Sequence, residues 1–229
     1  DALYNYPMSR SDPKVRPNAL HIAIMPYTED QAIKKLYTGI SATLTEYFIS
    51  VFNCPSDPSR ALLPDWSKGT TSYLSNGVLF SDKPKMSKVR DGTTKTIAFC
   101  ESYTRALVNG KVGAAKYTPK TGTGAATFAH PENDGTKVVG RANHPGNDKW
   151  SSGYNASGVN ALYGSTEPPI QSSPKPDEAD GTRIQSIHSS VINVALVDGS
   201  VQSISDSIDP VVFWSYVTPS GGEVANLDQ

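Results

Sequence analysis

The strongest signals for the fold lie in IHSSVINVALVDGSVQSISDSIDP, from Ile187 to Pro210. Its centre, VINVALV, is apolar at all but one position, which is typical of a strand in the middle of a sheet with both faces buried. Asp198-Gly199 follows directly and is a strong signal for a two-residue β-hairpin turn. SVQSIS is then predicted to be the returning strand, so the stretch indicates an antiparallel hairpin.

The predicted turn fixes which residues of the two strands face each other. A two-residue turn at Asp198-Gly199 places Val197 opposite Ser200 and Asn193 opposite Ile204. His188 would lie opposite Asp209 if the pairing continued that far.

The polar residues that surround the hairpin allow two interpretations. His188 together with Asp206 or Asp209 would make a metal or catalytic site. Alternatively, Asp209 followed by Pro210 is the pattern of a helix N-cap and a proline in the first turn, which predicts a helix over PVVFWSYV. We favour the structural interpretation, in which His188 is a hydrogen-bonding residue that fixes the entrance of the strand.

Composition excludes several classes of protein. The 229 residues carry 21 basic and 22 acidic side chains, a net charge of -1, so no nucleic-acid partner is expected. The 18 glycines and 17 prolines indicate many turns and short strands rather than a helix bundle. The sequence contains no run of 18 apolar residues, so no membrane-spanning segment is predicted within it.

The chain is predicted to be a single domain with a long insertion. Residues 109–182 hold 11 of the 18 glycines but only eight large apolar residues, too few for a core of their own. We therefore expect an insertion at 109–182 on a core formed by residues 1–108 and 183–229. Trp150, Tyr154 and Tyr163 would form either a contact surface for a sugar or a neighbouring subunit, or the insertion's own small core, which we favour.

Several motifs together resemble a known family. His188, nine further residues and Asp198-Gly199 resemble the C-terminal signature of the bacterial prepilin-like family known for its H-x9-DG motif. The blocks IMPYTEDQAI, FNCPSDP and VRDGTTKTIAFCES, in this order, are similar to three further blocks of that family. The resemblance implies an α+β fold: a pilin-like head with a central antiparallel sheet and short helices. It also implies an apolar N-terminal helix with a prepilin cleavage site, and neither is present in this sequence.

The resemblance further implies a function without catalysis. The expected protein is the head of a pilin-like or pseudopilin-like subunit of a filament or a secretion apparatus, on the surface of a bacterium, outside it or in its periplasm. Its partners would be other pilin-like subunits, and it would touch the membrane only through the missing helix. The alternative is a secreted or anchored binding module that recognises a glycan or peptide through residues 109–182.

The two cysteines, Cys54 and Cys100, match no zinc-binding spacing. From the residues alone, a disulfide and two separate buried thiols remain equally open. Cys100-Glu101 stands where the family has Gly-Glu, and the oxidising location that the resemblance implies favours a Cys54–Cys100 disulfide.

The sequence offers little positive evidence for a cofactor or for catalysis. The four histidines have no zinc-binding arrangement, and the chain lacks a G-x-S-x-G nucleophile motif. We therefore expect no enzyme and no zinc site. The resemblance implies a candidate calcium site, since some pseudopilins bind calcium in a C-terminal loop. Four carboxylates near the C-terminal end are the candidate ligands: Asp206, Asp209, Glu223 and Asp228.

Overall fold

The computed structural model of the chain supports a description of most of the predicted core. Structure is described for the following residues: 20–24, 27–28, 48–62, 69–76, 79–80, 85–108, 111–114, 127–131, 138–139, 170–181 and 183–222.

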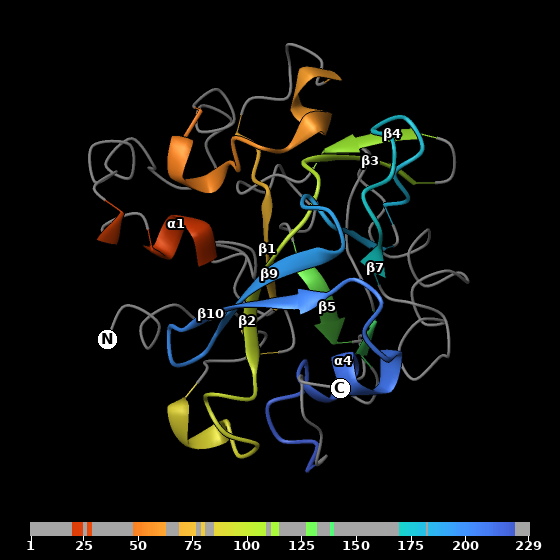
Figure 1. Cartoon of the computed structure of the whole chain (residues 1–229). Helices are drawn as coiled ribbons and strands as arrows, with labels where there is room; N and C mark the ends of the chain where they lie inside the picture. Colours follow the sequence, from red (N-terminus) through yellow and green to blue (C-terminus); the bar gives the residue numbers. More distant parts are fainter. Residues whose placement is uncertain are drawn as a thin grey trace.

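A six-stranded sheet forms the centre of the molecule (Figure 1), with the strand order β10-β9-β2-β1-β5-β6. Neighbouring strands are antiparallel except β1 and β5, which are parallel. The predicted α+β fold with a mainly antiparallel sheet is therefore confirmed. The six strands are β1 (Tyr73–Asn76), β2 (Ile97–Glu101), β5 (Thr127–Pro131), β6 (Val138–Val139), β9 (Val191–Leu196) and β10 (Val201–Ser205).

Smaller elements surround this sheet. The strands β3 (Arg105–Val108) and β4 (Lys111–Ala114) pair antiparallel, and β7 (Ile170–Gln171) and β8 (Ile184–Gln185) pair parallel. All described helices are short: α1 (Leu20–Ile24), α4 (Pro210–Ser215) and the 3-10 turns Ser50–Phe52, Pro58–Leu62 and Met86–Lys88.

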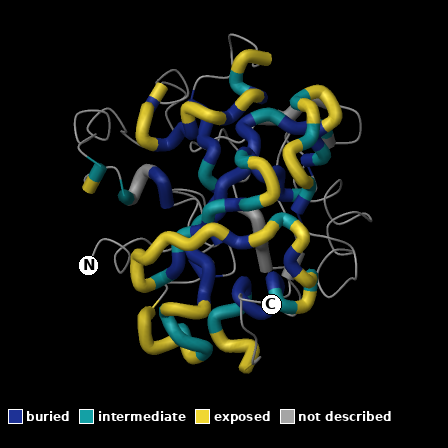
Figure 2. Tube along the Cα trace, viewed as in Figure 1, coloured by how far each residue is buried: buried dark blue, intermediate teal, exposed yellow. Residues whose placement is uncertain are grey.

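The predicted hairpin is present and lies where its composition indicated. The apolar strand β9 has β10 on one side and β2 on the other, so it is a central strand. The hairpin runs across β1 and β2 in the view of Figure 1, and β10 is coloured mostly as exposed in Figure 2. Four of the five β10 residues are exposed and only Ile204 is buried, in keeping with a strand whose outer face meets solvent.

The register of the hairpin differs by one residue from the prediction. Ile204 pairs with Ile192 instead of Asn193, and Asn193 pairs with Ser203. A shift of one residue moves every side chain of a strand to the other face. In the observed register Ile192 and Ile204 point to the same face, and both are buried in the main core.

A longer loop causes this shift. Val197, predicted to face Ser200, lies in a three-residue loop with Asp198 and Gly199. The Leu196 amide donates to the Ser200 carbonyl at 2.9 Å, and the Gly199 amide donates to the Leu196 carbonyl at 3.0 Å. Gly199 has a φ of +87°, as the last residue of a type I turn followed by a bulge requires.

The helix after the hairpin begins as predicted. Oδ1 of Asp209 accepts hydrogen bonds from the amides of Val211 and Val212, at 2.8 and 3.2 Å, and Pro210 occupies the first turn. This N-cap satisfies two of the donors that a helix leaves without an internal partner. It orients α4 so that Phe213 and Trp214 are buried.

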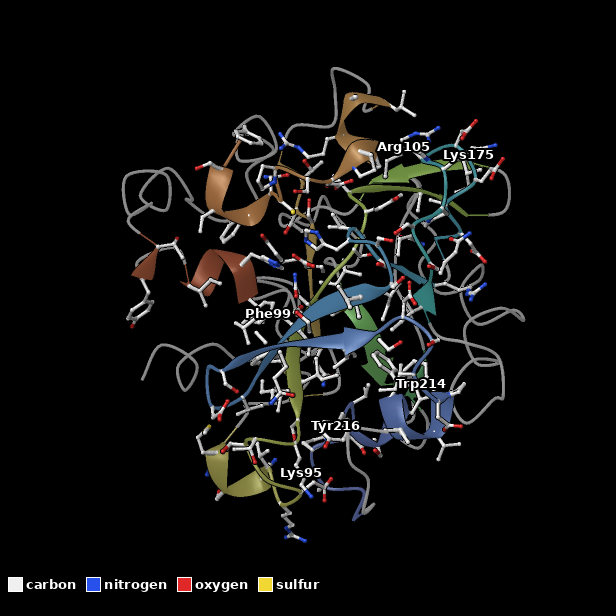
Figure 3. The ribbon with its side chains drawn as sticks, viewed as in Figure 1. Lys95, Phe99, Arg105, Lys175, Trp214 and Tyr216 are labelled. Carbon is white, nitrogen blue, oxygen red and sulfur yellow. The ribbon has the colours of Figure 1, made fainter. Side chains whose placement is uncertain are left out.

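The main hydrophobic cluster lies between α4 and one face of the sheet. Along β9, every second residue is buried and the residues between them are only partly buried, so one face is fully covered, and not both faces as predicted. Trp214 and Tyr216 lie at this end of the molecule in Figure 3. The buried members of the cluster are Leu74, Ile97, Cys100, Ile170, Ile184, Ile192, Val194, Leu196, Ile204, Ile208, Phe213, Trp214, Tyr216 and Val217.

The opposite face of the sheet carries two smaller clusters. Phe99 of β2 lies between this strand and α1 (Figure 3), and it packs against the cluster that contains Leu20 of that helix. Cys54 belongs to the other cluster, with Tyr103, Ala106, Ala179 and Ile187.

The predicted Cys54–Cys100 disulfide is not formed, and both cysteines are buried. The reason is the alternation of side chains along β2. Cys100 points into the main cluster under α4, whereas its neighbour Glu101 points to the opposite face, where Cys54 lies. The sheet therefore separates the two thiols.

The segment predicted to be an insertion contributes to the core of the molecule. Strand β5 lies within residues 109–182 and pairs with β1 in the central sheet, and Ile170 is a buried member of the main cluster. The boundary between core and insertion is thus less sharp than predicted. Trp150, Tyr154 and Tyr163 lie outside the described residues.

Within the part of the chain that the structure describes, none of the helices has the length and apolar character needed to cross a membrane.

Candidate functional site

Three chemically reactive side chains meet on the sheet face opposite α4. They are Cys54, Glu101 and His188, and one donor atom of each lies within 4.8 Å of the other two. Cys54 and Glu101 are buried, and His188 is partly exposed. Each comes from a different sequence block, because Cys54 lies in FNCPSDP, Glu101 ends the strand in TIAFCES and His188 precedes β9. The fold therefore builds one site from three distant segments.

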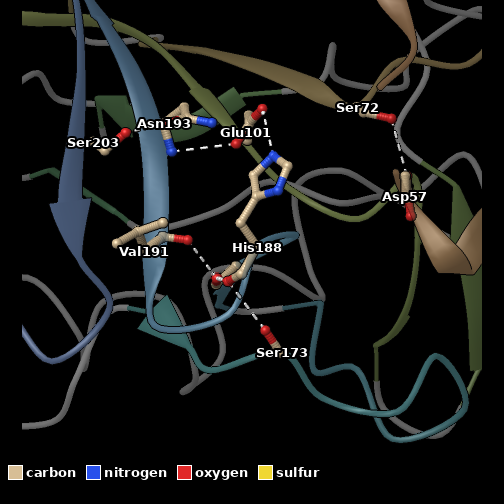
Figure 4. A network of polar contacts seen from close by, with 9 residues as sticks. Asp57, Ser72, Glu101, Ser173, His188, Val191, Asn193 and Ser203 are labelled. Atoms are coloured by element: carbon tan, nitrogen blue, oxygen red, sulfur yellow. Dashed lines mark hydrogen bonds and ion pairs between the residues drawn. The ribbon is translucent and has the colours of Figure 1, made fainter. Parts of the chain in front are cut away.

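Glu101 is the centre of this arrangement (Figure 4). Its Oε1 lies 3.5 Å from Nε2 of His188, and its Oε2 accepts a hydrogen bond of 3.2 Å from the backbone amide of Asn193. The Glu101 side chain is only 8% exposed. A buried carboxylate is costly unless charges or donors compensate it, so these contacts stabilise its position. The Asn193 side chain is itself bonded, since its Oδ1 accepts from the Ser203 hydroxyl at 2.6 Å.

His188 enters the site from a tight turn before β9. It forms an isolated antiparallel bridge with Val191, and Ser190 between them has a φ of +63°. The His188 carbonyl accepts a hydrogen bond from the Ser173 hydroxyl at 3.2 Å, and the Ser186 hydroxyl contacts the carbonyls of both His188 and Val191. These contacts fix the backbone, while the imidazole keeps 37% of its side-chain surface exposed.

A loop held by Asp57 presents Cys54. The Asp57 side chain is buried and accepts five hydrogen bonds from three residues. Its Oδ1 accepts from the amide and hydroxyl of Ser59, at 2.9 and 2.6 Å. Its Oδ2 accepts from the Ser72 hydroxyl at 2.9 Å and from the amide and hydroxyl of Thr104, at 2.7 and 2.6 Å. The carboxylate thereby ties the cysteine loop to the strands on either side.

Tyr73 lies beside the three side chains. Burial, followed by the negative charges that Cys54 and Glu101 carry when ionised and by a hydrogen bond with Cys54, raises the pKa of its phenol above the ordinary value. Tyr73 is paired with Glu101 across β1 and β2, so both side chains point to the same face of the sheet. The phenol therefore remains protonated and is a polar neighbour of the site.

A family match accompanies this geometry. The model of a family described as "Protein of unknown function (DUF1559)" matches residues 63–211, more than half of the chain. The chain belongs to this family. The DUF1559 match includes Glu101 and His188, whereas Cys54 precedes the matched region. No curated protein and no solved structure matches the chain.

The predicted partners of His188 are not those found in the structure. His188 lies at the entrance of β9, as predicted, but its imidazole faces Glu101, not Asp206 or Asp209. Asp206 instead accepts a hydrogen bond from the Ser172 hydroxyl, and Asp209 caps α4. The sequence pattern missed Glu101 because the residue lies in a strand far from His188 in the chain.

The predicted calcium ligands are only partly described. Asp206 and Asp209 make the internal contacts given above, and Glu223 and Asp228 lie outside the described residues. Calcium binding by this set stays a prediction, which melting curves with chelator and with millimolar Ca²⁺ would test.

Proposed function

We propose that this chain is the globular head of a pilin-like or pseudopilin-like subunit, which acts by assembly at the bacterial cell surface or in a secretion apparatus. In this role the head is not catalytic. An apolar N-terminal helix would pack into the filament, and the head would form its outer surface.

One observation carries the proposal. The H-x9-DG stretch from His188 to Gly199 forms a turn and a central strand, and the capped helix α4 follows it. This stretch is where the chain resembles the prepilin-like family, and the same region lies within the DUF1559 match. The α+β fold with a mainly antiparallel sheet supports the proposal, because it is the fold that the resemblance implies for a pilin-like head.

The site around Glu101 is compatible with a non-catalytic role. Two of its three side chains are buried, and the hydrogen bonds of Asp57 and Asn193 hold the cysteine loop and the carboxylate in place. Such a site stabilises a head and fixes the relative positions of its segments.

Shearing of surface filaments tests the proposal. Cells that express the natural protein are sheared, and the filament fraction is collected by centrifugation and probed with an antibody against residues 183–222. We expect the chain in the sheared filament fraction, and we expect gold-labelled antibody to decorate filaments in electron micrographs. A strain that lacks the prepilin peptidase is the matched control and should lose this signal.

One result of this experiment would contradict assembly into a filament. If the chain occurs only as a monomer in the medium or periplasm, with or without the peptidase, the assembly proposal fails. The alternative of a binding module would then gain support, and deletion of residues 140–169, which leaves β6 in place, would test whether ligand binding depends on that segment.

A further inference from the structure

The ligand atoms of Cys54, Glu101 and His188 lie close together. A thiol sulfur, a carboxylate oxygen and one imidazole nitrogen all lie within 4.8 Å of one another. Two of these three side chains are buried. Three ligand atoms at such distances could hold one ion.

The separation of Glu101 and His188 supports this interpretation. A charge-assisted hydrogen bond between a nitrogen and a carboxylate is about 2.8 Å long, so 3.5 Å is long for such a bond. Two ligand atoms that each lie about 2.0–2.1 Å from one tetrahedral ion are roughly 3.3 Å apart. The Nε2 to Oε1 distance of 3.5 Å is close to that separation.

The burial of two ligands leads in the same direction. Cys54 and Glu101 are buried and offer a sulfur and an oxygen atom to the same small region. An ion between them would bond both atoms where water is mostly excluded.

We propose that Cys54, Glu101 and His188 bind a divalent transition-metal ion, with Zn²⁺ as the preferred ion. Sulfur excludes Mg²⁺ and Ca²⁺ as the natural occupants, because these ions take oxygen ligands. A thiolate, an imidazole and a carboxylate form a donor set that suits Zn²⁺. Three protein ligands leave one tetrahedral position for a water molecule or another donor.

A catalytic triad is the competing interpretation of the same three residues. In a triad, the nucleophile and the carboxylate bind different nitrogens of the histidine ring, so that the ring relays a proton between its two sides. Here the sulfur and the carboxylate oxygen lie near the same donor nitrogen. This arrangement suits chelation and does not suit a relay through the ring.

The surroundings hold the ligands ready for an ion. The Asn193 amide binds Oε2 of Glu101, which leaves Oε1 facing His188. The buried Asp57 carboxylate fixes the loop that carries Cys54, through hydrogen bonds to Ser59, Ser72 and Thr104. Contacts of this kind orient metal ligands in proteins. The partly exposed imidazole of His188 gives an ion access from solvent.

The test is a metal titration of the whole chain. The purified, reduced and metal-free protein is dialysed against Zn²⁺, and bound metal is counted by mass spectrometry. We expect one Zn²⁺ per chain and a rise in Tm of about 5–10 °C when free Zn²⁺ exceeds Kd about 100-fold. Co²⁺ in place of Zn²⁺ should give the near-ultraviolet charge-transfer band of a thiolate ligand.

Two variants test the ligands, and a third is the control. Cys54→Ser and His188→Gln should each weaken Zn²⁺ binding more than about 100-fold, and Cys54→Ser should also lose the Co²⁺ charge-transfer band. Cys100→Ala is the matched control, because it removes the other buried thiol on the opposite face and should keep full binding. If circular dichroism shows that Cys54→Ser does not fold, His188→Gln carries the comparison, since its side chain is partly exposed.

Two results would overturn the proposal. The first is a wild-type chain that binds no Zn²⁺ and whose Tm does not move with the ion. The second is a Cys54→Ser or a folded His188→Gln variant that retains wild-type affinity, which would place the ion elsewhere. Both readouts are independent of filament assembly, so neither result bears on the proposed function.

Discussion

His188 Nε2 lies 3.5 Å from Oε1 of Glu101, although one residue precedes β9 and the other ends β2. The two strands are neighbours in the sheet, and this pairing brings together the histidine of the H-x9-DG stretch and the glutamate of the preceding block. Cys54 completes the group from a third block. Three of the four motifs that mark the resemblance thus contribute a residue to one place in the fold.

Asp57→Asn should destabilise the fold strongly. The amide keeps the shape of the carboxylate, but its nitrogen cannot accept the hydrogen bonds that Ser72 and Thr104 donate to Oδ2. Hydrogen bonds to a buried charge contribute about 1.5–3 kcal/mol each, so we expect a loss of roughly 3 kcal/mol or more. Urea unfolding of the variant measures the loss. Asp177→Asn, at an exposed position, is the control, and equal losses in both variants would contradict the assigned role.

Asp209→Ala should remove the N-cap of α4. The two amides of Val211 and Val212 then lose their shared acceptor, which costs about 1 kcal/mol and lowers Tm by about 2–4 °C. Thermal unfolding followed by circular dichroism measures the change. Asp209→Ser retains an acceptor at the cap position and should recover most of the stability. A wild-type Tm for Asp209→Ala would show that the cap contributes nothing.

Gly199→Ala should be costly because of the backbone and not because of crowding. A Cβ at this position would meet no atom within 4 Å, but the φ of +87° disfavours residues with a side chain. The expected loss is about 1–2 kcal/mol. Gly199→Asn should lose less, since asparagine tolerates this region better. If alanine and asparagine are equally harmless, the loop does not have the bulged geometry described above.

The fold should become less stable as the pH falls below about 6.5, because His21 is buried. The ring is fully buried between Phe52 and Phe99, and burial lowers the pKa of His21 from 6.5 to about 4, while its hydrogen bond with the Tyr73 carbonyl acts in the opposite direction. Between these two pH values the unfolded chain binds a proton that the folded chain does not. The contribution of neutral His21 to the free energy of unfolding is therefore present in full above pH 6.5 and is lost as the pH approaches 4. The total loss is about 3 kcal/mol.

Urea unfolding at several pH values between 7 and 4 measures this contribution of His21 to the free energy of unfolding. The His21→Phe variant cannot take up the proton and should lose about 3 kcal/mol less than the wild type over that range. The carboxylates titrate in both proteins and cancel in the comparison. Parallel curves for the two proteins would show that His21 is not the group responsible.

Local signals in the sequence predicted the hairpin and the helix cap. The apolar run of β9, the glycine at 199 and the Asp209-Pro210 pair each act within a few residues, so their consequences could be read directly. The register of the hairpin could not be predicted in this way. The amides of Val197 and Asp198 donate to the carbonyls of Thr96 and Thr93, which belong to a different segment. Those contacts favour the longer loop and depend on the assembled sheet.

The candidate site was missed for a similar reason. Zinc-binding spacings find ligands that lie close together in sequence, whereas Cys54, Glu101 and His188 come together only through the pairing of β2 with β9 and the fixed cysteine loop. The disulfide prediction was wrong because the face to which Cys100 points depends on the side-chain alternation of β2. The available signal was that the blocks around Cys54, Glu101 and His188 each carry at least one residue of ligand type.

The most direct test of the proposed function is top-down mass spectrometry of the natural protein isolated from its source cells. If the chain is the head of a pilin-like subunit, the mature protein should begin with a methylated residue, followed by an apolar segment of about 20 residues before Asp1. A natural protein whose N-terminus lies close to Asp1, with no apolar segment before it, would contradict assembly through such a helix.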